Sequence, residues 1–261
     1  MIIQKLTYRP FVLAAGLVFA AEPVFAQTPV VRIVGVSNLT PTNDAEWRGG
    51  DGKTTTIPKA DSRFEGLHLT PAPKERGVRF LIEILNAPKE RSCDVQIDKA
   101  TGLAWISFPQ PGDTRLYAVE ANLPENVQSC DMRVGVSKAE WRDVAEGTGG
   151  STARAGSVYG ADGKPKTFEV IFSDFSEFGG APGLTVSTAI TSDQDIRVVG
   201  VDAAGGVIEP QIRSDQSINA IEQRTVTFPG KSVDSLKSIK VQARPYEWRE
   251  FKGVKLPPVK A

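Results

Sequence analysis

The chain has few of the residues that most catalytic and metal sites require. Among its 261 residues there is one histidine, His68, and there are two cysteines. A histidine-rich zinc site needs more than one imidazole. A Ser-His-Asp or Cys-His centre would have to use His68, and no Gly-x-Ser-x-Gly elbow is present to hold a nucleophile. We therefore expect no catalytic residue, no metal and no cofactor.

An excess of charge of one sign is also lacking. The sequence has 31 basic and 31 acidic residues, and no basic run is longer than a pair. A protein that binds nucleic acid needs a surplus of Lys and Arg to neutralise phosphates, and attraction to an anionic membrane surface needs the same surplus. We expect neither nucleic acid nor a membrane surface as a partner.

Long apolar runs are absent after residue 26, so no membrane span is expected in the remainder. At the start, Lys5 and Arg9 precede an apolar run over Phe11–Ala21, and the small-residue pattern Val24-Phe25-Ala26 follows. This order is typical of a secretory signal peptide, with an uncleaved anchor as the alternative. Cleavage after Ala26 would leave a mature chain of 29 basic and 30 acidic residues that starts at Gln27. We expect the protein to be periplasmic or secreted.

The two cysteines, Cys93 and Cys130, both follow the expected signal peptide. Oxidants outside the inner membrane maintain disulfides, so we expect these two residues to pair. Such a bridge would stabilise the fold by about 3–4 kcal/mol in the chain-entropy model. A metal-binding or nucleophilic pair is the alternative, although there is no Cys-x-x-Cys spacing to support it.

Short apolar runs with a period near two make up most of the remaining chain, and Gly, Pro, Asn and Asp separate them. This alternation predicts β-strands. The expected strands are Val30–Val36, Val78–Leu85, Cys93–Ile97, Leu103–Phe108, Leu116–Leu123, Met132–Val136, Phe168–Phe172, Leu184–Ile190, Ile196–Val201, Gln223–Phe228, Ser238–Ala243 and Trp248–Val254. Many short strands at this spacing predict an all-β, antiparallel β-sandwich fold of the jelly-roll or immunoglobulin-like kind.

One change of composition suggests how the chain is divided. Residues 147–166 are rich in Gly, Ser, Thr, Ala and Lys, which indicates a linker or a long loop. The expected parts are a signal peptide (1–26), a β-rich unit with the disulfide (27–146), this linker, and a second β-rich unit (167–261). One large sandwich with an insertion is the alternative. The tripeptide Val-Gly-Val recurs at 34–36, 134–136 and 199–201, by duplication or by chance.

The four tryptophans fall into two groups. Trp105 lies in the apolar run Leu-Ala-Trp-Ile-Ser-Phe and is expected in the core, whereas Trp47, Trp141 and Trp248 each stand between Glu and Arg. A ring with such neighbours suits a half-exposed position with Arg stacked on it. These three rings are candidates for a stacking platform for carbohydrate, and packing over a strand edge is the alternative. We expect Trp47 to be the most exposed and Trp248 to be partly core.

The carboxyl end carries the pattern Gln242-x-Arg244-Pro245-Tyr246-x-Trp248-x-x-Phe251-x-x-Val254-x-Leu256. It resembles the closing motif of a family of uncharacterised bacterial exported modules. Similar modules are appended to membrane-anchored sensor metallopeptidases and to sigma-factor-like regulators. The resemblance implies a β-rich extracytoplasmic module without a known ligand, and it brings no catalytic residue with it. The motif is either a closing strand or a ligand surface, and in the second case Arg244 and Tyr246 join the ligand candidates.

Together these features predict a non-catalytic binding or sensing module of the cell envelope. Its partner would be an unidentified protein or glycan. The alternatives are a carbohydrate-binding module and a carbohydrate or cell-wall hydrolase, which would need a pair of carboxylates. The sequence places Asp174 near Glu177 and Asp193 near Asp195, but solvated strand ends explain these acidic pairs equally well.

Overall fold

The computed structural model of the chain describes residues 28–39, 46–57, 67, 69–87, 92–137, 140–148, 150, 152–159, 165–189, 193–218 and 221–259. The expected signal peptide (1–26) and His68 lie outside these residues. The strands are β1 (Val30–Asn38), β2 (Glu75–Leu85), β3 (Cys93–Ile97), β4 (Gly102–Pro109), β5 (Arg115–Pro124), β6 (Ser129–Ser137), β7 (Arg142–Gly147), β8 (Thr152–Tyr159), β9 (Pro165–Phe172), β10 (Ser176–Phe178), β11 (Ala181–Thr188), β12 (Gln194–Asp202), β13 (Val207–Ile208), β14 (Gln211–Ile218), β15 (Ile221–Thr227) and β16 (Leu236–Lys255). A short 3-10 helix, η2 (Val233–Ser235), precedes β16.

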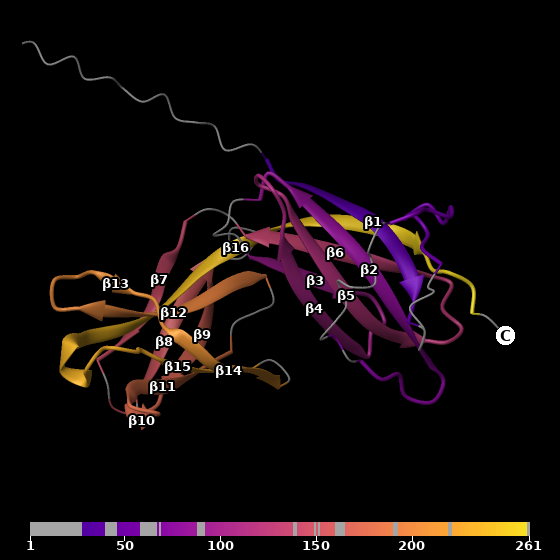
Figure 1. Cartoon of the computed structure of the whole chain (residues 1–261). Coiled ribbons are helices and arrows are strands. Elements are labelled where there is room, and N and C mark those ends of the chain that lie inside the picture. The colour runs from indigo at the N-terminus through magenta and orange to yellow at the C-terminus, as the bar shows by residue number, and fades with distance from the viewer. Residues whose placement is uncertain are drawn as a thin grey trace, which may run out of the picture.

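The prediction of an all-β fold with antiparallel sheets is confirmed. Each strand pairing among the described residues is antiparallel, and the sheets pack face to face in two sandwiches (Figure 1). Among the residues that the structure describes, no helix has the length and apolar character needed to cross a membrane.

The first sandwich packs the sheet β1-β2-β5-β4 against β3, β6 and the second half of β16. Alternate residues of each strand supply its core, such as Phe80 and Ile82 of β2 and Met132 and Val134 of β6. This alternation is what period-two patterning predicts when one face of each sheet is buried. On the opposite face of β2, Leu81 packs into a smaller apolar cluster, so this strand is covered on both faces.

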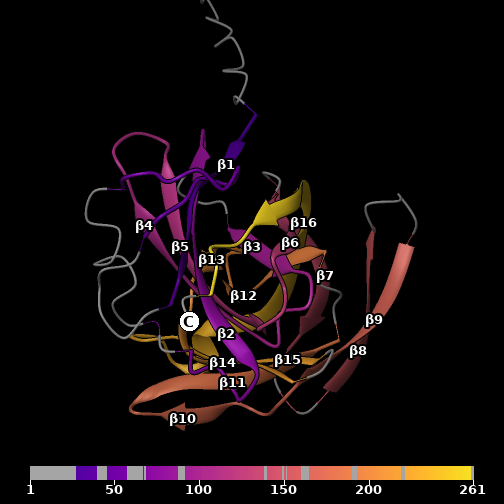
Figure 2. The same cartoon turned by 90° about the vertical axis from the view of Figure 1, so that its right-hand side faces the viewer.

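The second sandwich packs β14-β15-β11-β9-β8 against β13, β12, the first half of β16, and β7. Its core includes Phe168, Phe172 and Phe228, with aliphatic residues of β11, β12 and β16. Part of the sheet β14-β15-β11-β9-β8 comes from the segment 147–166, where a linker or long loop was expected. Within that segment β8 pairs with β9 along its full length, and Figure 2 shows this hairpin standing out from the rest of the sheet.

The long strand β16 belongs to both sandwiches (Figure 1). We expected two strands here, but Leu236–Lys255 is one strand of 20 residues. Its first half pairs with β12 on one side and β7 on the other, and its second half pairs with β6. Pairing with β6 ends at Tyr246 and pairing with β7 begins at Ala243, so the interruption coincides with Pro245. Proline lacks the N–H for a ladder hydrogen bond, which explains why the strand tolerates it there.

The expected disulfide is wrong, because the register separates the two cysteines. Both are free and buried in the first core. Cys93 pairs with Val136 across β3 and β6, and Cys130 lies six residues from Val136 along β6. Six residues of strand span about 20 Å, whereas the Cα atoms of a disulfide lie within about 7 Å of each other. Burial raises the pKa of the Cys93 thiol and raises that of Cys130 to about 11.

Candidate functional site

Four of the five ligand candidates meet on one face of the sheet that both sandwiches share. Trp141, Arg244, Tyr246 and Trp248 lie on β16 or just before β7, where one sandwich joins the other. Their side chains contact residues on the face opposite the two cores, which we call the outer face of this sheet. The motif at the carboxyl end therefore forms the junction between the sandwiches.

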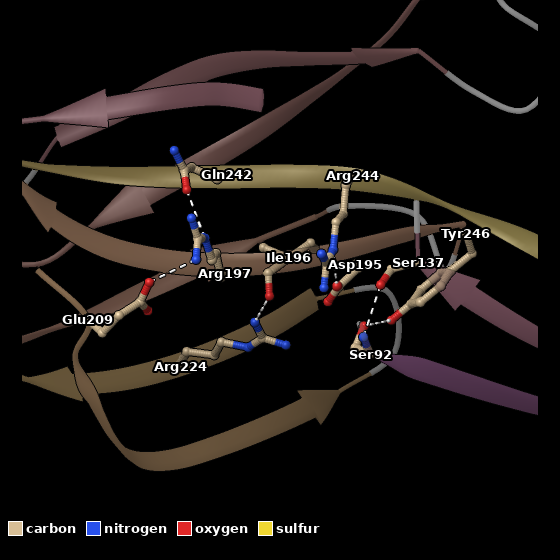
Figure 3. A network of polar contacts seen from close by, with 10 residues as sticks. All are labelled: Ser92, Ser137, Asp195, Ile196, Arg197, Glu209, Arg224, Gln242, Arg244 and Tyr246. Carbon is tan, nitrogen blue, oxygen red and sulfur yellow. Dashed lines mark hydrogen bonds and ion pairs between the residues drawn. The ribbon is translucent and has the colours of Figure 1, made fainter. Parts of the chain in front are cut away.

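Arg244 is the most buried member of this group. Its side chain is 2% exposed, and its Nε donates to Asp195 Oδ2 over 2.7 Å (Figure 3). The guanidinium Cζ atoms of Arg244 and Arg197 lie 4.0 Å and 4.5 Å from the centre of the Trp141 ring. An arginine that is buried, ion-paired and stacked in this way holds neighbouring strands together. The arrangement supports the structural interpretation of Arg244 and Trp141.

Gln242 extends this network of polar contacts across three strands. Its Oε1 accepts from Arg197 Nε over 2.8 Å and its Nε2 donates to Asp143 Oδ1 over 2.6 Å. Arg197 also donates to Glu209 Oε1 over 2.8 Å (Figure 3). Cross-strand pairs of this kind fix the register of neighbouring strands. Gln242 therefore has a structural partner on each side of β16.

Tyr246 joins β16 to the start of β3. Its hydroxyl lies 3.4 Å from Ser92 Oγ, and Ser92 N donates to Ser137 Oγ over 2.9 Å (Figure 3). Burial raises the pKa of the Tyr246 phenol. Its own N–H donates to the carbonyl of Asp193 over 3.1 Å, just before the start of β12. These contacts indicate that Tyr246 has a structural role, because it connects β16 to β3 and β12.

Trp248 is different, because it is half-buried and stacks on Arg133, a residue that lines a pocket. The Cζ atom of Arg133 lies 4.3 Å from the centre of its ring, and Tyr246 packs 5.5 Å from it, centre to centre. Gln96 orients Arg133 by accepting from its Nε over 2.7 Å, and donates in turn to Asp94 over 3.2 Å. The indole Nε1 atom is buried and has no hydrogen-bond acceptor among the described residues.

The pocket lies at the ends of β3, β6 and β16 in the first sandwich. Its volume is about 350 Å³. Gln96, Arg133 and Glu250 form one row across the three strands on the outer face. The lining residues, which define the β16 pocket, are Gln96, Ile97, Asp98, Asp131, Met132, Arg133, Glu250, Phe251 and Lys252.

Both charge signs occur in the β16 pocket. Its acidic residues are Asp98, Asp131 and Glu250, and its basic residues are Arg133 and Lys252. Asp131 Oδ1 accepts from the N–H of Gly253 over 2.8 Å, where β16 changes register between Phe251 and Val254. A pocket of this size with a few converging polar groups is typical of small-ligand sites. The mixed charge suits a polar ligand better than a strongly charged one.

Trp47, the fifth candidate, lies elsewhere, and its expected exposure is wrong. It is 5% exposed and packs with Leu81 and Leu116 on the outer face of the first sheet. Its neighbour Arg48 forms two backbone hydrogen bonds with Val36 of β1, so the segment lies antiparallel beside that strand. The flanking Glu46 and Arg48 side chains face away and pair with each other over 2.9 Å.

The expectation for Trp105 is also wrong, in the opposite direction. Its side chain is 41% exposed, because β4 is the last strand of its sheet among the described residues. The ring contacts Tyr117 edge-on with centres 6.0 Å apart. An apolar run predicts a strand but not whether that strand lies at an edge.

The described residues contain no cluster of three or more His, Cys, Asp or Glu side chains that could hold a metal ion. Asp195, which belongs to one of the acidic pairs in the sequence, forms an ion pair with Arg244. The sequence indicates that Asp94 and Gln96 share a face of β3, because they alternate with Cys93 and Val95. It gives no signal for the partners that β6 and β16 bring to this face.

Comparisons with models of protein families, with curated proteins and with solved structures found no match to this chain.

Proposed function

We propose that the protein is an exported, non-catalytic binding module of the bacterial cell envelope, and that its ligand occupies the β16 pocket beside Trp248. The observation that carries this proposal is Arg133, which lines the pocket and stacks on the half-buried Trp248 ring. Gln96 and the indole hold the guanidinium in place, so it is positioned to donate to a ligand oxygen.

A glycan fits the chemistry of the pocket better than an ionic ligand does. Hydroxyl groups both donate and accept, so one sugar can donate to Asp131 and Glu250 while it accepts from Arg133. The guanidinium of Arg133 covers one face of the Trp248 indole. The sugar therefore contacts Arg133 instead of the ring face, and this contact replaces the stacking platform that the sequence suggests.

The test is a glycan array of envelope polysaccharide fragments, followed by calorimetry with the glycans that bind. Trp248→Phe changes the indole on which Arg133 stacks, and Glu250→Gln removes a carboxylate of the pocket. Trp141→Phe is the matched control, because its ring stacks on Arg197 and Arg244, which do not line the pocket. We expect the first two variants to weaken binding by about tenfold, since each disturbs a charged contact with the ligand. Equal affinity in all three variants would reject this pocket, and no bound glycan would reject the ligand class.

A hydrolase is the second candidate, because the β16 pocket contains both Asp131 and Glu250. Glycosidases use two carboxyl groups on either side of the scissile bond. The same bound glycans decide between the two functions. Release of new reducing ends by the wild type, and its loss in both Asp131→Asn and Glu250→Gln, would assign catalysis to this pair.

The proposal of export depends on residues 1–26 and on the resemblance of the closing motif to exported modules. Mass spectrometry of protein from the envelope fraction tests it directly. We expect a mature chain that starts at Gln27. A chain of full length that stays with the membrane would contradict the proposed cleavage.

A further inference from the structure

Strand β4 differs from the other sheet edges of the molecule. It pairs with β5 on one side and is the last strand of its sheet among the described residues. Three of its apolar side chains are more than a third exposed, and no charged residue occurs between Ala100 and Gly112. Those side chains are Leu103, Trp105 and Ile106.

The other described edge strands carry features that discourage pairing with another chain. Natural edge strands use charged side chains, bulges or short length for this purpose. In this molecule β1 carries Arg32 and a register shift, β14 carries Arg213 and a register shift, and β8 carries Arg154. β3 carries Asp94, and β13 is two residues long. In contrast, β4 has eight residues that pair with β5 without a shift.

The register shows which backbone groups of β4 have no hydrogen-bond partner within the described part of the sheet. The ladder between β4 and β5 continues to Gln110, whose N–H donates to the carbonyl of Thr114 over 3.1 Å. Hydrogen-bonded pairs alternate along an antiparallel ladder. The even-numbered residues of β4 therefore bond to β5, and Leu103, Trp105 and Ser107 direct their N–H and C=O groups to the open edge.

We propose that β4 is a self-association edge, which pairs antiparallel with β4 of a second copy of this chain. A two-fold axis at Trp105 places Leu103 of each copy opposite Ser107 of the other, so the free donors and acceptors match. The same axis places the two Trp105 rings side by side, and aromatic cross-strand pairs stabilise sheets.

Charge complementarity favours a second copy as the occupant. The charged residues nearest to β4 are Lys99 before its start and Asp113 beyond its end. Antiparallel pairing brings the start of one strand next to the end of the other, so these opposite charges approach twice in the pair. One strand of eight residues is smaller than the roughly 20–30 residues on each side of a standard interface. We therefore expect a dimer that dissociates on dilution.

The experiment is sedimentation equilibrium of the purified protein over a range of concentrations, with two substitutions at one position. Ser107→Pro removes a free N–H and adds a ring at the open edge without removing a hydrogen bond to β5. Ser107→Ala is the matched control. We expect the wild type and Ser107→Ala to dimerise alike, and Ser107→Pro to raise the dissociation constant at least about tenfold. A wild type that stays monomeric up to about 1 mM would overturn the proposal.

Two further variants keep the test decisive if Ser107→Pro does not fold. Trp105→Lys places two like charges at the axis and should abolish the dimer. Trp105→Cys should form a disulfide-linked dimer on oxidation, because Cα atoms in a hydrogen-bonded pair lie about 5.5 Å apart. Val207→Cys, which is exposed in the second sandwich, is its control. Equal cross-linking at both positions, or a folded Trp105→Lys that still dimerises, would also reject this edge.

Discussion

Trp47 and Trp248 occupy matching positions in the first sandwich and differ in what covers them. Each ring lies over the glycine of a Val-Gly-Val strand, Gly35 on β1 and Gly135 on β6. A Cβ atom at Gly35 would approach Trp47 to 2.9 Å, and one at Gly135 would approach Trp248 to 3.1 Å. The third copy of the tripeptide follows the same rule, because a Cβ at Gly200 would lie 2.9 Å from Phe228. The recurring tripeptide thus marks places where a strand gives up a side chain to admit an aromatic ring.

The difference lies in the surroundings of the two rings. Trp47 is closed in by Leu67, Leu81 and Leu116, while Trp248 is covered by Arg133, which lines the polar β16 pocket. The same packing of a ring over a glycine therefore gives a structural tryptophan on one outer face of the sandwich and a tryptophan next to the candidate site on the other.

The largest expected effect concerns the closed ring. Trp47→Ala should lower the free energy of unfolding by about 3–5 kcal/mol, because it leaves a cavity in an apolar cluster. Trp105→Ala, the same change at an exposed ring, should cost less than about 1 kcal/mol. Urea unfolding of the two variants measures both values. Equal costs would contradict the burial difference on which the comparison depends.

The glycine beneath the open ring should matter next. Gly135→Ala places a methyl group 3.0 Å from Tyr246 Cβ, and such overpacking costs about 1–3 kcal/mol. Gly50→Ala is the control, because its methyl group would lie 3.7 Å from Ile33, an ordinary contact. Thermal unfolding of this pair gives the difference. If Gly135→Ala is as stable as its control, Trp248 does not need the space over β6.

Alkaline pH should destabilise the first sandwich more than the second. Burial raises the pKa of Cys130 from 9.0 to about 11 and raises that of Cys93 in the same direction. Above pH 9.0 the unfolded thiols ionise while the native ones stay protonated, so the native state binds more protons and the free energy of unfolding falls as pH rises. The loss from Cys130 alone should be about 2 kcal/mol at pH values near 11, and Cys93 adds to it.

Urea unfolding on both sides of pH 9.0, with Cys130→Ala as the control, measures this loss. The variant should reduce the pH dependence without abolishing it, because burial also raises the pKa values of Cys93, Tyr117 and Tyr246. The described part of the second sandwich holds no cysteine, so its hydrogen exchange, corrected for intrinsic rates, should change less than that of the first. A loss of the same size in both sandwiches would contradict this assignment.

The smallest effect should come from a reducing agent. With Cys93 and Cys130 apart, reduction has no bond to break, and the free energy of unfolding should not change. Loss of a native disulfide typically costs about 2–5 kcal/mol. Thiol titration after unfolding should find two free thiols, and finding none would support the disulfide instead.

The sequence predicts the strands well, because alternation reports burial directly. It misses β7, β8, β10, β13 and β14; in β8, Thr-Ala-Arg-Ala-Gly-Ser at an edge has few apolar side chains to alternate. It also misplaces Trp47, because its flanking charges describe neighbours that face the opposite way, and Trp105, because an apolar run does not show whether its strand lies at an edge. The cysteine pairing and the β16 pocket depend on the register between distant strands, which no local pattern encodes.

The shared strand β16 has a consequence for how the chain is made. The first sandwich starts at β1, but Phe251, Val254 and Leu256 complete its core from the far end of the sequence. The second sandwich is an insertion between β6 and the last half of β16, and it also waits for the first half of that strand. Neither core can close before residues 236–256 have been synthesised. A premature stop at Arg244 would therefore remove the last strand from the sandwich that was made first.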